Sequence, residues 1–364
     1  MRIEANALKV KNLVIVALCG MIIPIARVLD RHAAASADSA AWLTPFVAAV
    51  LFVPYAFILK KLTERYPDTP LTEINRLLFG KAVGTVVNTV YLLWFLFLSG
   101  YYLCQFGERM ATTVFYNTNS AVFISVMLLL LSLTLRFGQE TVLRACGMFF
   151  YAVAAVFVLS LLLLLKNGHI EYHLPVTVSL LPGVFTGGIQ IFSALTYFVT
   201  VPFFFGDIRS EKTGKSLCIG GVVALSFALL GVIVIVGCFS APLVAAMPYP
   251  FFSAIKEITI FKSIERIEAI IVSVMVLSDF VIIALFVLCG GRTAKDTFRL
   301  KGNIPYDLLL LTVFVVSLFF SYQSVRLNEI SSSLIVPVNL AVGGGLPVLT
   351  FLMLLIRKKK VSAD

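Results

Sequence analysis

Long runs of apolar residues, separated by short polar segments, fill almost the whole chain. A helix that crosses a bilayer needs about 20 consecutive, mostly apolar residues. About ten runs approach or exceed that length, at residues 11–28, 40–60, 82–106, 119–136, 142–165, 183–206, 215–240, 266–290, 305–323 and 332–356. The pattern predicts an all-α polytopic membrane protein with about ten transmembrane helices.

Composition supports the same class of protein. Of the 364 residues, 60% are hydrophobic and 13% are charged, against about 45–50% and about 25% in soluble domains. One water-soluble core cannot bury so much apolar surface, because single cores stop growing at about 250–300 residues. The 6 cysteines form no CxxC pair and most lie in apolar runs, so we interpret them as buried apolar side chains.

The basic residues predict the orientation of the chain. With the N-terminus inside, most of the 29 lysines and arginines fall in the inner connections, as the positive-inside rule requires. Arg27, Arg31 and Arg109 are among those assigned to outer segments. Both termini are then cytoplasmic, which requires an even number of spans. This orientation also accounts for the net charge of +10, and we expect no nucleic-acid partner.

Two connections are expected to form structure of their own. Residues 69–80 carry apolar side chains at helical spacing, which predicts an amphipathic helix on the inner surface. An ordinary solvated connector helix is the alternative. The outer segment 241–265 begins with prolines that forbid a continuous helix, and a short helix is expected over Ser253–Phe261.

The first and sixth runs hold the candidate binding site, because glycine or proline interrupts both of them. They stand first in the two halves of a 5+5 inverted repeat, at about 11–165 and about 183–356. An unwound span exposes backbone groups that can hold the ammonium and carboxylate of an amino acid. The alternative is that these glycines only allow close helix packing. The candidate ligand-binding residues are Cys19, Gly20 and Met21 in the first run, with Pro24 following, and Ser193, Thr196 and Tyr197 in the sixth.

Asp279 is the most interior acidic residue, near the middle of the eighth run. A carboxylate there costs roughly 2.5–3.5 kcal/mol on insertion scales, so it must face the bundle or water. It is either a contact for a ligand ammonium, a cation or a proton, or a hydrogen-bonded structural acid. Tyr102 is a further candidate for the ligand-binding cavity, whereas Glu108 and Arg109 are interpreted as anchors at the membrane interface.

No catalytic constellation is found in the sequence. His169 and His173 have the i,i+4 spacing of zinc-binding helices, but the order HIEYH is not HExxH, and Gly168 and Pro175 oppose a helix. A P-loop, a GxSxG motif and a Rossmann fingerprint in its strand–helix setting are all missing. We therefore predict neither an enzyme nor a metal or cofactor site.

The segment Pro248–Phe280 carries three motifs in order. They are Tyr249-Pro250, Ser253-Ala254 and Glu265-Arg266-Ile267-Glu268-Ala269. In this order, leading into the eighth span, they resemble the signature of the B subunits of spore germination receptors, which has a Tyr-Pro pair, a Ser-Ala helix and an ERxEA-type sequence. Weaker matches extend the resemblance over about residues 10–360, at Arg65-Tyr66-Pro67, Gly80-Lys81, His173-Leu174-Pro175-Val176 and the terminal Arg-Lys-Lys-Lys.

This resemblance implies a ten-span fold of the amino acid–polyamine–organocation permease type. It implies a sensor of small nutrient germinants, such as an amino acid, in the inner membrane of the spore. It also implies two partners, a germinant receptor A subunit and a lipoprotein C subunit. The chain departs from the family pattern at Asp279, where a small residue is usual, and near Leu195-Thr196-Tyr197, where an acidic residue is often found.

Two other functions stay open. A working secondary amino acid permease needs a coupling site for Na⁺ or H⁺, and Asp279 is the one candidate acid. A passive scaffold or ion conduit for partner subunits would tolerate changes in the first and sixth spans.

Overall fold

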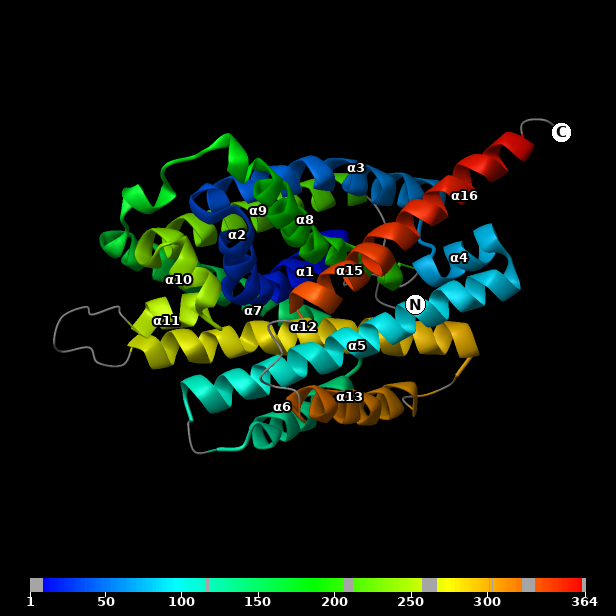
Figure 1. Ribbon diagram of the computed structural model, residues 1–364. Helices are drawn as coiled ribbons and strands as arrows, with labels where there is room; N and C mark the ends of the chain where they lie inside the picture. The colour runs from blue at the N-terminus through cyan, green and yellow to red at the C-terminus, as the bar shows by residue number, and fades with distance from the viewer. Residues whose placement is uncertain are drawn as a thin grey trace.

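Long helices run roughly side by side and form one bundle (Figure 1). The computed structural model describes residues 9–361 apart from 116–117, 206–211, 257–266, 301, 303 and 323–330. Within these residues, 9 helices are long and apolar enough to cross a membrane, and α6 (Ser120–Leu135) is a shorter apolar helix at the fourth predicted run. The predicted all-α membrane fold is confirmed, because every apolar run is helical.

The helices follow the predicted runs closely. The first two spans comprise α1 (Val10–Pro24), the π-helical turn η2 (Ile25–Leu29), α2 (Asp30–Ala37), the 3-10 turn η3 (Asp38–Leu43) and α3 (Thr44–Arg65). The next spans are α5 (Lys81–Thr113), α6, α7 (Gln139–Leu164), α8 (Leu181–Leu195) with the 3-10 helix η7 (Thr196–Phe204), and α9 (Thr213–Phe239). The last are α12 (Ile267–Phe298), α13 (Ile304–Tyr322), and a tenth span of η9 (Ser331–Ile335), α15 (Val336–Val338), η10 (Asn339–Gly345) and α16 (Leu346–Val361).

The first span is interrupted after Pro24, not at Cys19-Gly20 as the sequence suggested. Helix α1 runs unbroken through both residues, and the π-helical turn follows at Ile25–Leu29. Proline has no N–H to donate to the carbonyl four residues earlier, and its ring crowds that carbonyl. Gly20 instead lets α1 approach α12, because a Cβ there would lie 3.1 Å from Cβ of Ile282.

The sixth span changes its backbone form at Thr196, where the sequence placed its break. Helix α8 ends at Leu195 and a 3-10 helix continues to Phe204. The glycines of α8 do not unwind it. A Cβ at Gly183 would lie 1.9 Å from the backbone oxygen of Ser36, and one at Gly187 would lie 2.5 Å from its hydroxyl. These glycines serve close helix packing, which was the alternative interpretation.

Short helices lie at the two opposite ends of the bundle (Figure 1). At one end is the amphipathic helix α4 (Leu71–Phe79), beside the C-terminal part of α16. At the other end are α10 (Ala241–Ala246) and α11 (Pro250–Lys256). Helix α11 begins three residues before the predicted Ser253, and the rest of that predicted helix lies outside the described residues.

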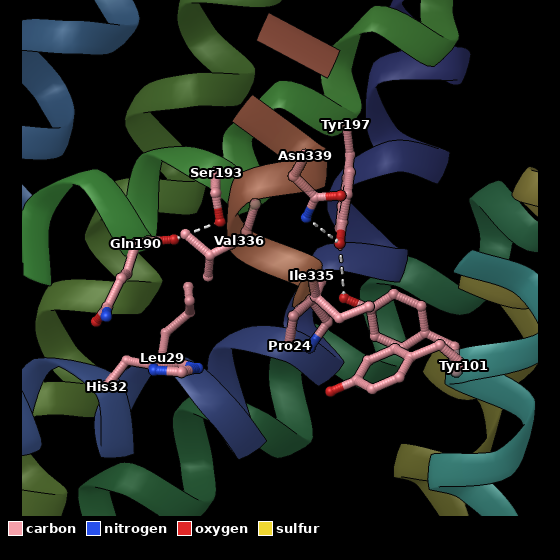
Figure 2. Close-up of a pocket in the computed structure, with 12 residues that line it drawn as sticks. Pro24, Leu29, His32, Tyr101, Gln190, Ser193, Tyr197, Ile335, Val336 and Asn339 are labelled. Carbon is pink, nitrogen blue, oxygen red and sulfur yellow. Dashed lines mark hydrogen bonds between the residues drawn. The ribbon is translucent and has the colours of Figure 1, made fainter. Parts of the chain in front are cut away.

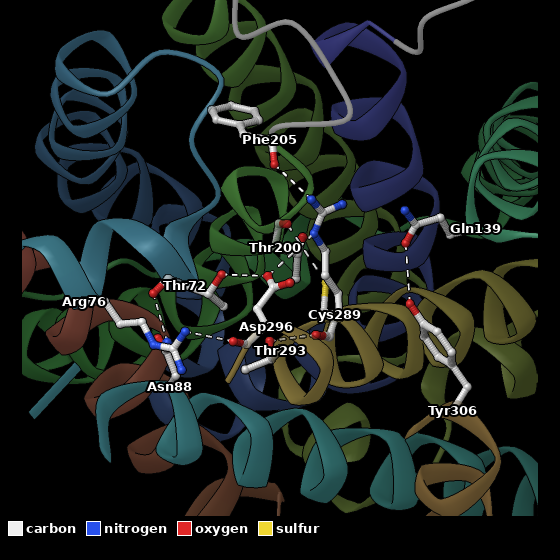
Figure 3. A network of polar contacts seen from close by, with 11 residues as sticks. Thr72, Arg76, Asn88, Gln139, Thr200, Phe205, Cys289, Thr293, Asp296 and Tyr306 are labelled. Atoms are coloured by element: carbon white, nitrogen blue, oxygen red, sulfur yellow. Dashed lines mark hydrogen bonds and ion pairs between the residues drawn. The ribbon is translucent and has the colours of Figure 1, made fainter. Parts of the chain in front are cut away.

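Hydrogen bonds attach α4 to three spans, and Figure 3 shows those to α5 and α12. The Thr72 hydroxyl donates to the Asp296 carboxylate of α12 at 2.7 Å, and the Asn88 amide of α5 donates to the Thr72 carbonyl at 2.9 Å. The Thr350 hydroxyl of the tenth span donates to the side chain of Asn75 at 3.1 Å. Buried polar groups are costly without partners, so these bonds fix α4 in place.

Candidate functional site

A small pocket lies where the interrupted first and sixth spans face the third and tenth spans (Figure 2). Its walls come from α1, η2, α2, α5, α8, η7, η9, α15 and η10. Twelve residues line it: Pro24, Leu29, His32, Tyr101, Tyr102, Gln190, Ser193, Ala194, Tyr197, Ile335, Val336 and Asn339. The space open to the centre of a water molecule is about 20 Å³, which is room for a water but not for an amino acid. In this structure the pocket is therefore too small for such a ligand.

A chain of hydrogen bonds crosses one wall of the pocket. The hydroxyls of Tyr102 and Tyr197 lie 3.0 Å apart, and the Asn339 amide donates to the Tyr197 hydroxyl at 2.8 Å. The Trp94 indole N–H in turn donates to the Asn339 oxygen at 3.0 Å. These bonds tie the third, sixth and tenth spans together around the pocket, and they place two phenol hydroxyls at its surface.

The backbone change in the sixth span is stabilised from outside that span. The Tyr55 hydroxyl of α3 lies 2.9 Å from the carbonyl oxygens of both Thr196 and Gly343. The Thr196 hydroxyl donates to the Ser193 carbonyl at 2.6 Å. Carbonyls freed where a helix changes form need such partners when they are buried. Thr196 is therefore part of the support behind the pocket, not of its lining.

A buried ionic cluster lies beside the pocket. Asp279 on α12 forms an ion pair with Arg109 on α5, and a second arginine, Arg27 of η2, has its Nη1 atom 3.9 Å from the other carboxylate oxygen. All three side chains are at most 1% exposed. The guanidinium carbon of Arg27 also lies 5.8 Å from the centre of the Tyr102 ring, which links the cluster to the pocket wall.

Two sequence-based assignments are corrected by this cluster. Arg109 is not an interface anchor, because it is fully buried and paired inside the bundle. Arg27 does not belong to an outer connection, because the helix continues past Pro24 and carries the arginine inward. A carboxylate inside a membrane span is costly without a partner, and the partner of Asp279 is Arg109.

Helix α11 and Tyr249, which directly precedes it, lie next to the cluster. The Phe252 ring centre lies 4.5 Å from the guanidinium carbon of Arg109. Burial raises the pKa of the nearby Tyr249 phenol, while the positive charges of Arg27 and Arg109 act in the opposite direction. The Tyr249-Pro250 motif therefore lies close to the two arginines.

The structure brings together only part of the predicted set. Tyr102, Ser193 and Tyr197 line the pocket. Asp279 lies in the adjacent cluster, where the Ser278 hydroxyl donates to the Cys19 carbonyl. Cys19, Gly20 and Met21 are buried in the regular part of α1 and do not line the pocket. That predicted binding role is not supported by their position.

Four polar residues of the pocket were not among the predicted binding residues. His32 lies between the first two runs, Gln190 lies inside the sixth run, and Asn339 is the one amide side chain in the tenth run. Tyr101 precedes the predicted Tyr102. The signal for Asn339 was available, because a buried amide inside a membrane span needs a partner. The position of His32 depends on the turn η2 before α2, and those of Tyr101 and Gln190 depend on which faces of α5 and α8 pack inward. The lengths of the apolar runs do not show this.

Sequence relatives and solved structures agree with this architecture. The family model described as "Spore germination protein" matches residues 10–329. Spore germination protein KB of Bacillus subtilis (strain 168) is 20% identical over 338 residues, which covers 88% of each chain. Spore germination protein YndE of the same organism is 22% identical over 281 residues, which covers 76% of this chain and 77% of YndE.

The likeness to a solved structure concerns the fold. The crystal structure of MhsT in complex with L-phenylalanine superimposes with a TM-score of 0.70 at 12% identity, covering 93% of this chain and 87% of MhsT. The predicted permease-type fold is confirmed by this match, and nothing about ligands follows from it. The family model covers most of the chain, and the curated relatives match in the same region. The chain therefore belongs to the spore germination protein family.

Proposed function

We propose that this protein is the membrane subunit of a nutrient germinant receptor, which binds a small germinant such as an amino acid and signals germination. The observation that carries the proposal is the pocket between the two interrupted spans, with tyrosine, asparagine, serine and glutamine side chains in its wall. Small-ligand sites combine apolar walls with a few convergent polar groups in this way. Family membership supplies the biological setting.

The pocket must widen to take a ligand, and hydrogen bonds in its wall oppose that widening. Opening it separates groups such as Tyr102, Tyr197 and Asn339, and a ligand with its own polar groups compensates for those lost bonds. The binding free energy then favours a different arrangement of the third, sixth and tenth spans. A sensor requires this coupling of occupancy to span position.

The partners and location form part of the same proposal. An A subunit and a lipoprotein C subunit complete the receptor, and the complex lies in the inner membrane of the spore with both termini of this chain in the cytoplasm. The family match and the excess of basic residues in the inner connections support these assignments. The two halves, about 11–165 and about 183–356, each contribute their first span to the pocket.

A working amino acid permease is the second candidate, favoured by the permease-type fold. Such a protein needs a free coupling acid, and Asp279 is already engaged by Arg109. We therefore rank the sensor first. Counterflow of labelled amino acids in proteoliposomes separates the two functions, because a sensor without transport gives none.

The test measures ligand binding and its dependence on the pocket. The purified protein is screened by thermal shift against the standard L-amino acids. We expect at least one to raise the unfolding temperature, and Tyr197→Phe to weaken its binding by about two- to tenfold, since one buried hydroxyl is worth about 0.5–1.5 kcal/mol. The matched control is Tyr151→Phe, because Tyr151 is 64% exposed on the outside of α7.

Two results would contradict the proposal. One is the absence of any thermal shift together with unaltered germination of spores that lack the protein. The other is a shift that Tyr197→Phe and Tyr151→Phe affect equally, because the binding would then lie elsewhere.

A further inference from the structure

The cluster beside the pocket contains more positive than negative charge. Two arginines, Arg27 and Arg109, share one carboxylate, that of Asp279. Asp30 makes no ion pair with either arginine among the described residues, and its carboxylate lies instead near Gly231 of α9, 3.0 Å from the position of a Cβ there. Glu108 points elsewhere, because it accepts a hydrogen bond from Ser321 at 2.7 Å. Among the described residues, one buried cation of this cluster is left without a matching anion.

Unused hydrogen-bond donors show where that anion would bind. The Arg27 side chain is 1% exposed, and none of its three nitrogens has a hydrogen-bond partner in the part of the chain that the structure describes. In Arg109 the Nε and Nη1 atoms are also buried without partners. A fully buried guanidinium is costly unless it is paired and hydrogen-bonded. The planar guanidinium matches the two oxygens of a carboxylate.

The position of Arg27 relates this cluster to the pocket. Arg27 lies in η2, between the pocket residues Pro24 and Leu29, and against the ring of Tyr102. A ligand whose anionic group met Arg27 would therefore have its remaining atoms beside Tyr102 and the pocket. The π-helical turn that follows Pro24 is what places the arginine there.

We infer that Arg27 binds the carboxylate of the ligand, so that the ligand class is carboxylates and not uncharged nutrients. The inference rests on the proposed function for the identity of the ligand as a germinant. It assigns a binding role to a residue that the sequence pattern placed in an outer connection. Arg109 keeps Asp279 neutralised, while Arg27 supplies the free donors.

The experiment uses the smallest carboxylates as probes. Thermal unfolding of the purified full-length protein is followed in sodium acetate and sodium propionate, with acetamide, propionamide and sodium chloride at equal ionic strength as comparisons. We expect acetate and propionate to raise the unfolding temperature and the other three additives to have little effect. Arg27→Gln should lower the apparent affinity for acetate by about tenfold or more.

The variant also separates binding from support of the fold. Arg27→Gln removes an unmatched buried charge, so its unfolding temperature without additive should be equal to or higher than that of the wild type. Arg27→Lys keeps the charge but loses the two-pronged geometry, and it should bind acetate more weakly as well. The matched control is Arg31→Gln, whose side chain donates to the Ala245 carbonyl at 2.9 Å. It should keep the acetate response.

Several outcomes would overturn the inference. They are an equal response to acetamide and acetate, an equal response to chloride, or a full acetate response in folded Arg27→Gln. Spores that fail to germinate with any amino acid, while acetate still binds through Arg27, would count against the proposed function and leave this site in place. If the carboxamide of a germinant triggers germination as well as the germinant itself, the role of Arg27 is contradicted and the proposed function stands.

Discussion

At the residue scale, the interior charges explain why Asp279 can lie inside a membrane span. Its carboxylate is paired with Arg109, on a helix that is 170 residues away in the sequence. Opposite charges that are buried together avoid the full cost of desolvation, whereas a charge left alone there does not. The pair should therefore be sensitive to the loss of either member.

We expect Asp279→Asn to destabilise the protein strongly, by about 3–5 kcal/mol, because it leaves two buried arginines without an anion. Thermal unfolding in detergent measures the effect. The double variant Asp279→Asn, Arg109→Gln should recover much of the lost stability. The control is Glu64→Gln in a surface ion pair with Lys61, at 49% exposure, which should cost about 1 kcal/mol or less. A stable Asp279→Asn variant would show that the ion pair contributes little.

At the scale of the elements, α8 lies unusually close to α2 and α3. Glycines make this possible, because three of them face the neighbouring helices without a side chain. Gly183 is the tightest position, since the atom that a Cβ would meet belongs to the backbone of Ser36 and cannot rotate away. Close packing of this kind is a main source of cohesion between helices in a membrane.

Gly183→Ala should therefore separate α8 from α2 and lower the unfolding temperature, because overpacking of this kind costs about 1–3 kcal/mol. The matched control is Gly147→Ala in α7, where the new methyl group would lie 3.8 Å from Val16, at ordinary contact distance. Alanine should be neutral or slightly stabilising there, since it favours helix over glycine. Equal unfolding temperatures for the two variants would contradict this account of α8.

The elements also show how far the sequence could predict the structure. The lengths of the apolar runs located the spans, because a helix needs a long apolar run to cross the bilayer. The change at Thr196 was foreseen from the polar patch around Ser193, but the break in the first span was placed at Gly20 although Pro24 causes it. Arg109 could not be assigned, because a run boundary says nothing about which helix face a residue occupies. Its partner depends on packing between distant spans.

At the scale of the whole molecule, the bundle has two distinct ends. Helix α4 lies at one end, and α10 and α11 lie at the other (Figure 1). The prediction that the α4 end is the inner one rests on the basic residues there, including Lys60, Lys61 and Arg76. An orientation prediction can therefore be tested at one residue on each side.

A cysteine in place of exposed Lys61 should be protected from an impermeant thiol reagent in right-side-out vesicles. A cysteine in place of exposed His169, in the connection between α7 and α8, should be labelled. The background carries Cys218→Ser, because Cys218 is the exposed native cysteine among the described residues. Both sites are exposed in the protein, so a difference in labelling reports the side of the membrane. Labelling at Lys61 and protection at His169 would show that the orientation is opposite to the predicted one.

The attachment of α4 has a mechanical consequence. Because α4 is bonded to α5, α12 and the tenth span, the ends of these three spans behave as one rigid frame. The irregular turns η2 and η7, at Ile25–Leu29 and Thr196–Phe204, lie outside that frame, and we expect them to act as its hinges. Tyr102 and Asp279 lie farther along two of these spans, α5 and α12, and Asn339 lies in η10 of the third. A force that tilts α4 therefore acts as a lever, and it displaces all three residues together relative to Arg27 and Tyr197.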